Sequence, residues 1–239
     1  MRSVDHHKFA ERGYVHLPAA ASEDVADDLR SRLWSAMGLS PHDPAGWTRP
    51  VVWATDLEDG PGATIMSSRS LRAALDTLLG VDTWQPRRDV GTIPVRFPVF
   101  PADDDRGWHI DQNTLGPDGQ PATSGRPWTV LLLVLLSTVG EDDAPTRIRV
   151  GSHRDTARVL DAEPLDSATA SRRLAPASTH RPVVTATGRP GDMYLCHPFL
   201  AHAAQEHHGA EPRFMAQTPI LLHEPLTPAG SSVMARSVW

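Results

Sequence analysis

Apolar residues recur at helical spacing in the first third of the chain. One stripe lies between Ser22, which suits a helix N-cap, and Gly38, which suits a C-terminal stop. Its members stand four residues apart: Val25, Leu29 and Leu33. A second stripe, of leucines, fills residues 70–80. Both stripes predict amphipathic helices that pack against a sheet, because periodic apolar residues are core positions by default.

From residue 93 onward the pattern changes to short apolar runs separated by Pro and Gly, which is typical of strands. The candidate strands are residues 95–99, 128–136, 148–150, 183–187, 193–196 and 214–222. Several short strands with turns between them predict a mainly β fold, either a sandwich or a barrel. Residues 128–136 are apolar at nearly every position, so we expect the barrel interior to cover one face of this strand and helices the other.

Two segments interrupt the strand pattern. Residues 116–127 are rich in Gly and Pro, and residues 161–176 contain no strand-like run. We expect both segments to be loops or lids at the rim of the barrel, because loops on a rigid scaffold tend to carry substrate contacts.

Length and composition favour one core. A chain of 239 residues with 40% hydrophobic residues can bury a single sizeable core. We therefore expect one domain over residues 1–239, with a helical flank at about residues 1–90 and a β core at about residues 91–225.

Charge and cysteine content exclude several classes of partner. The net charge is −6, and the basic residues form no run, which argues against nucleic-acid binding. The longest apolar run, residues 130–136, is too short to cross a bilayer, and residues 5–8 do not resemble the start of a signal peptide. The single cysteine, Cys196, excludes an internal disulfide and fits a small buried apolar residue. We expect a cytoplasmic protein.

The most specific chemical pattern is His109 and Asp111, followed 91 residues later by His202 and eleven residues after that by Arg213. Side chains two residues apart on a strand lie on the same face. Two imidazoles and one carboxylate on one face of a ferrous ion leave three positions open, enough for a bidentate organic acid and oxygen. A nearby guanidinium can hold the far carboxylate of that acid. The pattern therefore predicts an iron site with a co-substrate anchor.

A His-x-Asp triplet alone is weakly specific. With 12 His and 21 Asp in 239 residues, chance gives about one such triplet, and the chain has a second one at His153 and Asp155. The second triplet follows Gly and Ser residues that favour a turn. Its context therefore favours the triplet of His109 and Asp111. His197 is five residues from His202, so a regular strand would place these two side chains on opposite faces.

Together these residues resemble the phytanoyl-CoA dioxygenase family of iron(II)- and 2-oxoglutarate-dependent oxygenases, over roughly residues 9–220. The step of eleven from His202 to Arg213 matches the family pattern, as does the Gly191 and Asp192 pair before His202. Other matching positions are Phe9, Gly13, Tyr14, Val15, Trp108, Trp128, Thr129, Gly151, Ser152 and His153. The resemblance implies a double-stranded β-helix, or jelly roll, with flanking α-helices. The chain departs from the family in having Val150 where proline is usual and Ala204 where relatives often have a serine that contacts 2-oxoglutarate.

The resemblance implies roles for the matching residues. His109, Asp111 and His202 would hold Fe(II), and Arg213 would pair with the distal carboxylate of 2-oxoglutarate. Oxygen would then be consumed, with release of succinate and carbon dioxide and hydroxylation of the substrate. Halogenating relatives lack the ligand carboxylate, so Asp111 favours a hydroxylase over a halogenase.

Further residues have both a functional and a structural interpretation. Trp128 and Thr129 resemble a family pair near the co-substrate, although a tryptophan also suits a β core. Arg96, thirteen residues before His109, is where some relatives place a polar contact to the co-substrate, and an exposed edge charge is equally consistent. Without the resemblance, Arg213 could be an ordinary salt-bridge residue. Arg147, Arg149 and His153 could bind an anionic substrate, but a surface network is slightly favoured.

The leading hypothesis is an Fe(II)- and 2-oxoglutarate-dependent dioxygenase that hydroxylates an aliphatic carbon of a small-molecule metabolite. One alternative is a jelly-roll metal-binding or sensing module without turnover. Another is a cupin-like metalloenzyme that does not use 2-oxoglutarate. The acidic net charge gives no support for a phosphorylated substrate such as a CoA ester.

Overall fold

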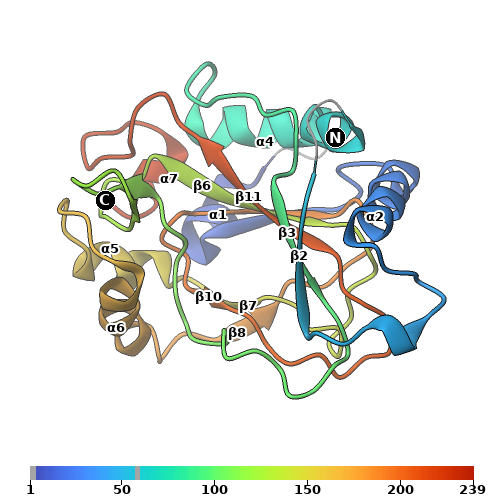
Figure 1. The fold of residues 1–239 in the computed structure, drawn as a ribbon. Coiled ribbons are helices and arrows are strands. Elements are labelled where there is room, and N and C mark those ends of the chain that lie inside the picture. Colours follow the sequence, from blue (N-terminus) through green and yellow to red (C-terminus); the bar gives the residue numbers. More distant parts are fainter. Residues whose placement is uncertain (1–3, 57–59) are drawn as a thin grey trace.

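Helices flank two main β-sheets, which have four and three strands (Figure 1). The computed structural model describes residues 4–56 and 60–239. Its helices are α1 (His6–Arg12), α2 (Glu23–Met37), η1 (Pro44–Gly46, a 3₁₀ turn), α3 (Pro61–Met66), α4 (Arg69–Leu79), α5 (His153–Val159), α6 (Ser167–Ala177) and α7 (Val233–Arg236). Its strands are β1 (Tyr14–Leu17), β2 (Val51–Thr55), β3 (Thr92–Arg96), β4 (Thr114–Leu115), β5 (Pro121–Ala122), β6 (Thr129–Leu135), β7 (Arg147–Arg149), β8 (Val183–Thr185), β9 (Met193–Cys196), β10 (His202–Ala203) and β11 (Met215–Leu221).

The two helices expected in the first third are present as α2 and α4. Helix α2 follows Ser22, whose side chain makes no capping hydrogen bond, and it ends at Gly38 with a φ of 66°. Helix α4 begins earlier than predicted, because the side chain of Ser68 accepts a hydrogen bond from the backbone N–H of Leu71. The leucine stripes of both helices are buried against the larger sheet.

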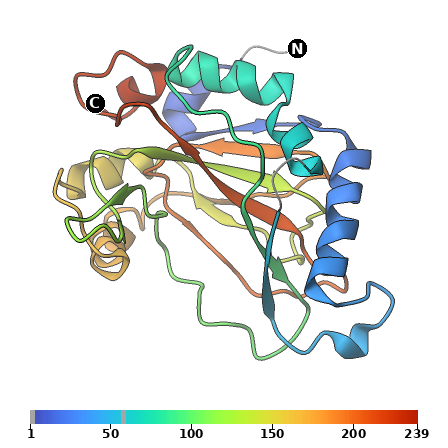
Figure 2. The same cartoon turned by 45° about the horizontal axis from the view of Figure 1, so that its top comes forward.

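The larger sheet contains β1, β9, β6 and β11 in that spatial order, all antiparallel. An antiparallel bridge between Arg96 and Arg213 joins the β2–β3 pair to the β11 edge of this sheet. Figure 2 shows the long β6 and β11 strands crossing the middle of the molecule side by side.

The smaller sheet contains β10, β7 and β8 in that order. An antiparallel bridge between His109 and His202 adds the extended segment around residue 109 to its β10 edge. The two sheets pack on each other through a buried cluster that includes Leu131, Leu133 and Leu135 from β6 and Ile148 from β7. This is a jelly roll, as the resemblance implies.

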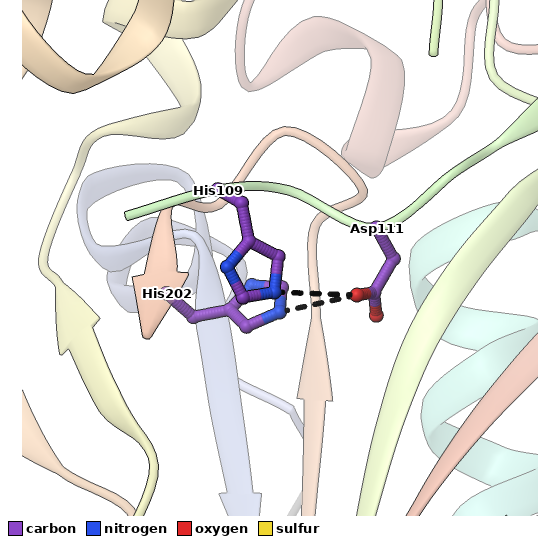
Figure 3. Close-up of side chains that lie close together, drawn as sticks. All are labelled: His109, Asp111 and His202. Carbon is purple, nitrogen blue, oxygen red and sulfur yellow. Dashed lines mark ion pairs between the residues drawn. The ribbon is translucent and has the colours of Figure 1, made fainter. Parts of the chain in front are cut away.

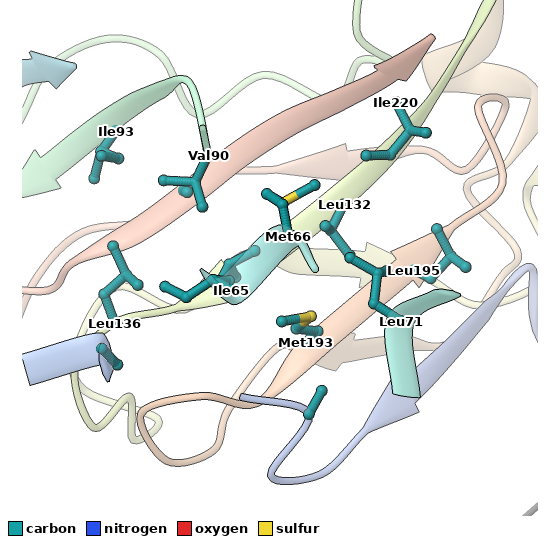
Figure 4. Close-up of a cluster of buried hydrophobic side chains, with 14 of the residues drawn as sticks. Ile65, Met66, Leu71, Val90, Ile93, Leu132, Leu136, Met193, Leu195 and Ile220 are labelled. Carbon is teal, nitrogen blue, oxygen red and sulfur yellow. The ribbon is translucent and has the colours of Figure 1, made fainter. Parts of the chain in front are cut away.

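Strand β6 is buried on both faces, as its continuous apolar sequence predicts. Its odd-numbered leucines face the smaller sheet. On its other face, Val130, Leu132 and Val134 join the core under the N-terminal helices. Figure 4 shows Leu132 beside Leu195 of β9, with Met66 and Leu71 from the helical flank over them.

Several boundaries differ from the sequence-based expectation. Strand β3 covers residues 92–96 and not 95–99, because Pro98 has no N–H to continue the ladder. Residues 116–127 include β5, which pairs with β4 in a short ribbon. Residues 161–176, expected to be a loop or lid at the rim of the barrel, are mostly helical, because α6 occupies most of this segment. The Asp166 carboxylate caps α6 by accepting from the N–H of Thr169 at 2.8 Å, and two α6 residues are buried: Ala170 and Leu174.

Candidate metal centre

The two histidines of the candidate site meet because their strands pair. The N–H of His109 donates to the carbonyl of His202 at 3.0 Å, and the N–H of His202 donates to the carbonyl of His109 at 2.9 Å. Asp111 stands two residues further along the same extended segment, and its carboxylate points toward both rings (Figure 3). The structure therefore brings together the three residues that the sequence pattern identifies.

The spacing of the three side chains fits one metal ion. Oδ1 of Asp111 lies 3.4 Å from Nε2 of His202 and 3.8 Å from Nε2 of His109. One ligand atom from each residue lies within 4.8 Å of the other two. Metal–ligand bonds of about 2.0–2.2 Å place the ligand atoms around a common ion at about 3–4 Å from one another.

Backbone carbonyls fix the orientation of both rings. Nδ1 of His109 lies 2.8 Å from the carbonyl of Gly107, and Nδ1 of His202 lies 3.0 Å from the carbonyl of Leu200. A carbonyl only accepts, so each Nδ1 donates its proton and each Nε2 of the neutral ring keeps a lone pair. Nε2 of His202 is buried without a hydrogen-bond partner. Two imidazoles and one carboxylate suit iron(II), so the residues present fit the ion.

The electrostatics of the site act differently on its three candidate ligands. Burial lowers the pKa of His109, and the nearby His202 lowers it further. Burial alone would raise the pKa of Asp111, but the nearby His202 outweighs it and keeps this pKa below its ordinary value. Burial opposes protonation of His202, but Asp111 outweighs it, so the pKa of His202 is raised. At neutral pH, His109 and Asp111 are therefore deprotonated.

Arg213 carries a buried charge that no carboxylate neutralises directly. Arg213 is 1% exposed, and its guanidinium donates hydrogen bonds to the carbonyls of Ala144 and Pro94, each at 2.9 Å. Its Nε has no partner, and among the described residues no carboxylate accepts a hydrogen bond from it. Burial, with the nearby charge of Arg96, lowers the pKa of Arg213 to about 9. A buried cation of this kind fits an anionic ligand, because an unpaired buried charge is unfavourable.

The other residues predicted to hold the co-substrate differ in burial and in their partners. Arg96 is buried, pairs its guanidinium with both carboxylate oxygens of Asp105, and bonds through its backbone to Arg213. Thr129 lines a small cavity together with Asp111 and His202. Trp128 is 41% exposed and does not line that cavity.

The second triplet has other partners. His153 and Asp155 lie in the first turn of α5, where residues two apart point in different directions. The Asp155 carboxylate accepts two hydrogen bonds from Arg181, at 2.6 and 2.9 Å. The ring of His153 is buried, with Nε2 3.2 Å from the carbonyl of Ala10.

Two spaces adjoin the triad. The small cavity has a volume of about 20 Å³, room for a water molecule, and His197 is among its lining residues. The second space is an open cleft of about 470 Å³ between the triad segment and α6. Ten residues line the cleft: Asp105, Gly107, Trp108, His109, Ile110, Asp111, Gln112, Ser167, Ala168 and Ser171. Arg213 lines neither space.

The sequence led us to expect substrate contacts from residues 161–176, but not that this segment forms the helix α6. Its residues Ser167, Ala168 and Ser171 form one wall of the cleft. The available signal was Asp166 as an N-cap before a segment of helix-forming residues. Arg147 and Arg149, for which a network was favoured over an anionic substrate, stack on Trp108 with their guanidinium carbons 5.0 and 4.1 Å from the ring centroid.

One comparison with known proteins identifies a family. The family model described as phytanoyl-CoA dioxygenase matches residues 9–215. A comparison with curated proteins finds no match.

Solved structures with similar folds include SnoK, a non-heme alpha ketoglutarate dependent carbocyclase from nogalamycin biosynthesis. It has 16% identity and a TM-score of 0.61, with coverage of 91% of this chain and 82% of SnoK. HygX from Streptomyces hygroscopicus, with nickel, 2-oxoglutarate and hygromycin B bound, has 17% identity and a TM-score of 0.59, with 91% and 87% coverage. EctD from S. alaskensis with bound Fe has 20% identity and a TM-score of 0.60, with 97% and 82% coverage. At these identities the likeness shows the shared fold.

Within the described residues, no helix is long and apolar enough to cross a membrane.

Proposed function

Since the chain belongs to the phytanoyl-CoA dioxygenase family of iron(II)- and 2-oxoglutarate-dependent oxygenases, we propose that it hydroxylates an aliphatic carbon of a small molecule. The observation that carries the proposal is the buried Nε2 of His202, which has no hydrogen-bond partner and faces Asp111 beside His109. A buried nitrogen lone pair that meets a carboxylate and a second imidazole is satisfied by a metal ion.

Each residue of the triad has a defined part in this proposal. His109, Asp111 and His202 hold iron(II), and the carbonyls of Gly107 and Leu200 keep both rings in the tautomer that presents Nε2. Bound iron would supply the activation of oxygen that couples decarboxylation of 2-oxoglutarate to oxidation of a C–H bond. Apolar side chains of Val130, Leu131 and Leu200 line the small cavity beside Asp111 and His202.

Arg213 is the proposed anchor for the distal carboxylate of 2-oxoglutarate. Its charge is already desolvated and its Nε is unpartnered, so a carboxylate would gain a charge-assisted contact there without new burial of the cation. We propose that Thr129, which lies beside Asp111 and His202, contacts the co-substrate. Arg96 acts through its backbone pairing with Arg213, because Asp105 already occupies its guanidinium. Trp128, which is partly exposed, is assigned no contact beyond its place before Thr129.

Asp111 supports hydroxylation over halogenation, because its carboxylate occupies the ligand position that a halide would need. SnoK and SnoN are described as a carbocyclase and an epimerase, so structures of this fold support other oxidations as well. The mass of the product distinguishes these outcomes, since hydroxylation adds one oxygen atom whereas ring closure or epimerisation does not. A cytoplasmic location, which the single cysteine favours, is part of the same proposal.

The experiment that tests the proposal is anaerobic titration of the purified protein with iron(II) and 2-oxoglutarate. We expect a weak visible charge-transfer absorption that Asp111→Ala abolishes. Admission of oxygen should then yield succinate. A protein that binds iron but yields no succinate with any substrate would be the sensing module. Activity that survives Arg213→Ala unchanged would instead indicate a metalloenzyme that does not use 2-oxoglutarate.

A further inference from the structure

The open cleft beside the triad has the dimensions of a small-molecule site. Its volume of about 470 Å³ lies within the usual range of about 300–1,000 Å³ for such sites. The small cavity on the other side of Asp111 has room for water only. The cleft between residues 105–112 and the first turns of α6 is therefore the space through which a substrate can reach the triad.

The polar groups of the cleft are acidic or neutral. The carboxylates come from Asp105 and Asp111, the hydroxyls from Ser167 and Ser171, and an amide from Gln112. No lysine or arginine is among the ten described residues that line it. A phosphate or carboxylate in this cleft would find hydroxyl and amide donors but no lysine or arginine side chain.

The guanidiniums near the cleft are already engaged elsewhere. Arg147 donates to the carbonyls of Ala204 and Arg106, and it stacks on Trp108. Arg149 donates to the carbonyl of Ala175 at 2.5 Å and to Oγ of Ser178 at 2.9 Å. These cations therefore stabilise the walls of the cleft and do not face a ligand inside it.

The same contacts make the cleft a preformed site. Arg149 joins the C-terminal end of α6 to β7 and covers the ring of Trp108 from 4.1 Å. Below α6, Ala170 and Leu174 pack in one cluster with Ile110, the residue between the two ligands of the triplet. Both walls are thus fixed relative to the triad, so the protein loses less conformational entropy when a ligand binds.

We propose that this cleft binds an uncharged or cationic substrate that carries hydroxyl or amino groups, and that it excludes anionic acyl thioesters. Ser167, Ser171 and Gln112 would contact the hydroxyl or amino groups, and the lining offers an anion no lysine or arginine, while Asp105 is already paired with Arg96. This assignment of a substrate class rests on the proposed function. It departs from the acyl-CoA ester that the family description names.

The charge of the cleft is testable without knowledge of the substrate. Ser171→Cys places a thiol in the cleft, and the native Cys196 is 1% exposed, so background labelling is low. Rates of reaction with a cationic and an anionic methanethiosulfonate reagent are compared, each divided by the rate for free 2-mercaptoethanol. We expect at least about a five-fold preference for the cationic reagent at low salt, which shrinks at high salt because exposed charges are screened.

Arg172→Cys is the matched control, since residue 172 is exposed on the same helix and does not line the cleft. It should show no preference for the cationic reagent. An equal or greater relative rate for the anionic reagent at position 171 would overturn the proposed charge selectivity.

Binding tests the substrate class itself. Titration calorimetry with hydroxylated amines, neutral polyols and octanoyl-CoA should give measurable binding in one of the first two groups, with at least ten-fold weaker binding of octanoyl-CoA. Ala168→Trp, which fills the cleft, should weaken that binding at least ten-fold, and Arg172→Trp should change it less than two-fold. Tighter binding of octanoyl-CoA, no binding by either group, or no effect of Ala168→Trp would each overturn the proposal. Because these measurements need neither oxygen nor turnover, they fail or succeed separately from the iron and 2-oxoglutarate test.

Discussion

Replacing Arg213 with methionine should stabilise the protein and abolish its affinity for 2-oxoglutarate. The guanidinium is fully buried and burial lowers its pKa to about 9, against an ordinary value of 12.5. A folded pKa below the unfolded value means that the charged form is disfavoured by folding. The penalty is fully present below about pH 9 and declines as the pH rises toward 12.5. The difference between the two pKa values corresponds to a loss of about 5 kcal/mol in the free energy of unfolding at neutral pH.

Two hydrogen bonds offset part of this penalty. Methionine would leave the carbonyls of Ala144 and Pro94 without the donors they now have, at a cost of about 1–2 kcal/mol each. The net expectation is a gain of about 2 kcal/mol in the free energy of unfolding, or a rise of about 4–8 °C in the melting temperature of a chain this long.

Calorimetry with and without ligand separates the two effects. Iron(II) and 2-oxoglutarate, each at about 100 times its Kd, should each stabilise the wild type by about 2.7 kcal/mol, and Arg213→Met should show no increment from 2-oxoglutarate. Arg96→Met is the control, because the side chain of Arg96 pairs with Asp105, and the substitution leaves its backbone pairing with Arg213 in place. It should lower stability by about 1 kcal/mol and keep the ligand increment. A less stable Arg213→Met that still responds to 2-oxoglutarate would refute the reasoning.

Three further predictions concern the metal, pH and α6. Asp111→Ala should lower iron(II) affinity by at least about 100-fold, as measured by competition with a chelator, because it removes the one anionic ligand; unchanged affinity would remove Asp111 from the ligand set. Burial, with Arg154 nearby, lowers the pKa of His153 to about 4, so unfolding takes up a proton between about pH 6.5 and 4. Over this range, urea titration should show a loss of about 3 kcal/mol from this residue, and a loss of the same size in His153→Leu would contradict that assignment. Leu174→Ala should cost about 2–4 kcal/mol in thermal or chemical unfolding, since Leu174 packs with Ile110 under α6; a cost near zero would show that α6 contributes little to stability.

Elements that depend on local periodicity could be predicted from the sequence. Strand β6 is apolar at consecutive positions because both of its faces are covered, and the helices α2 and α4 follow leucine stripes at intervals of about four. The position of β3 was less accurate, because the apolar residues of 95–99 continue past Pro98, where the ladder ends. Apolar pattern marks burial, and only hydrogen bonding sets the end of a strand.

Helix α6 shows why the remainder was not predictable from pattern alone. Only Ala170 and Leu174 of its eleven residues are buried, and Pro176 near its end breaks the expected helical sequence. Their packing partners Ile110 and Phe199 are distant in the sequence. A helix stabilised by so few apolar contacts has a weak periodic signal, so its place over the triad depends on tertiary structure.

The triad divides into a local and a non-local part for the same reason. Strand alternation places the side chains of His109 and Asp111 together whatever the rest of the fold, whereas His202 reaches them only because β10 pairs with their segment in the smaller sheet. Arg213 is fixed by a different pairing, with Arg96 at the edge of the larger sheet. The metal ligands and the proposed anchor therefore belong to opposite layers of the barrel, and substitutions that shift one layer relative to the other would separate them.

Helix α6 is attached to this framework through Arg149 and a small apolar cluster, so its cleft-facing residues can vary without disturbing the metal ligands. Substrate choice is thus expected to reside in Ser167, Ala168 and Ser171, while the chemistry resides in the strands.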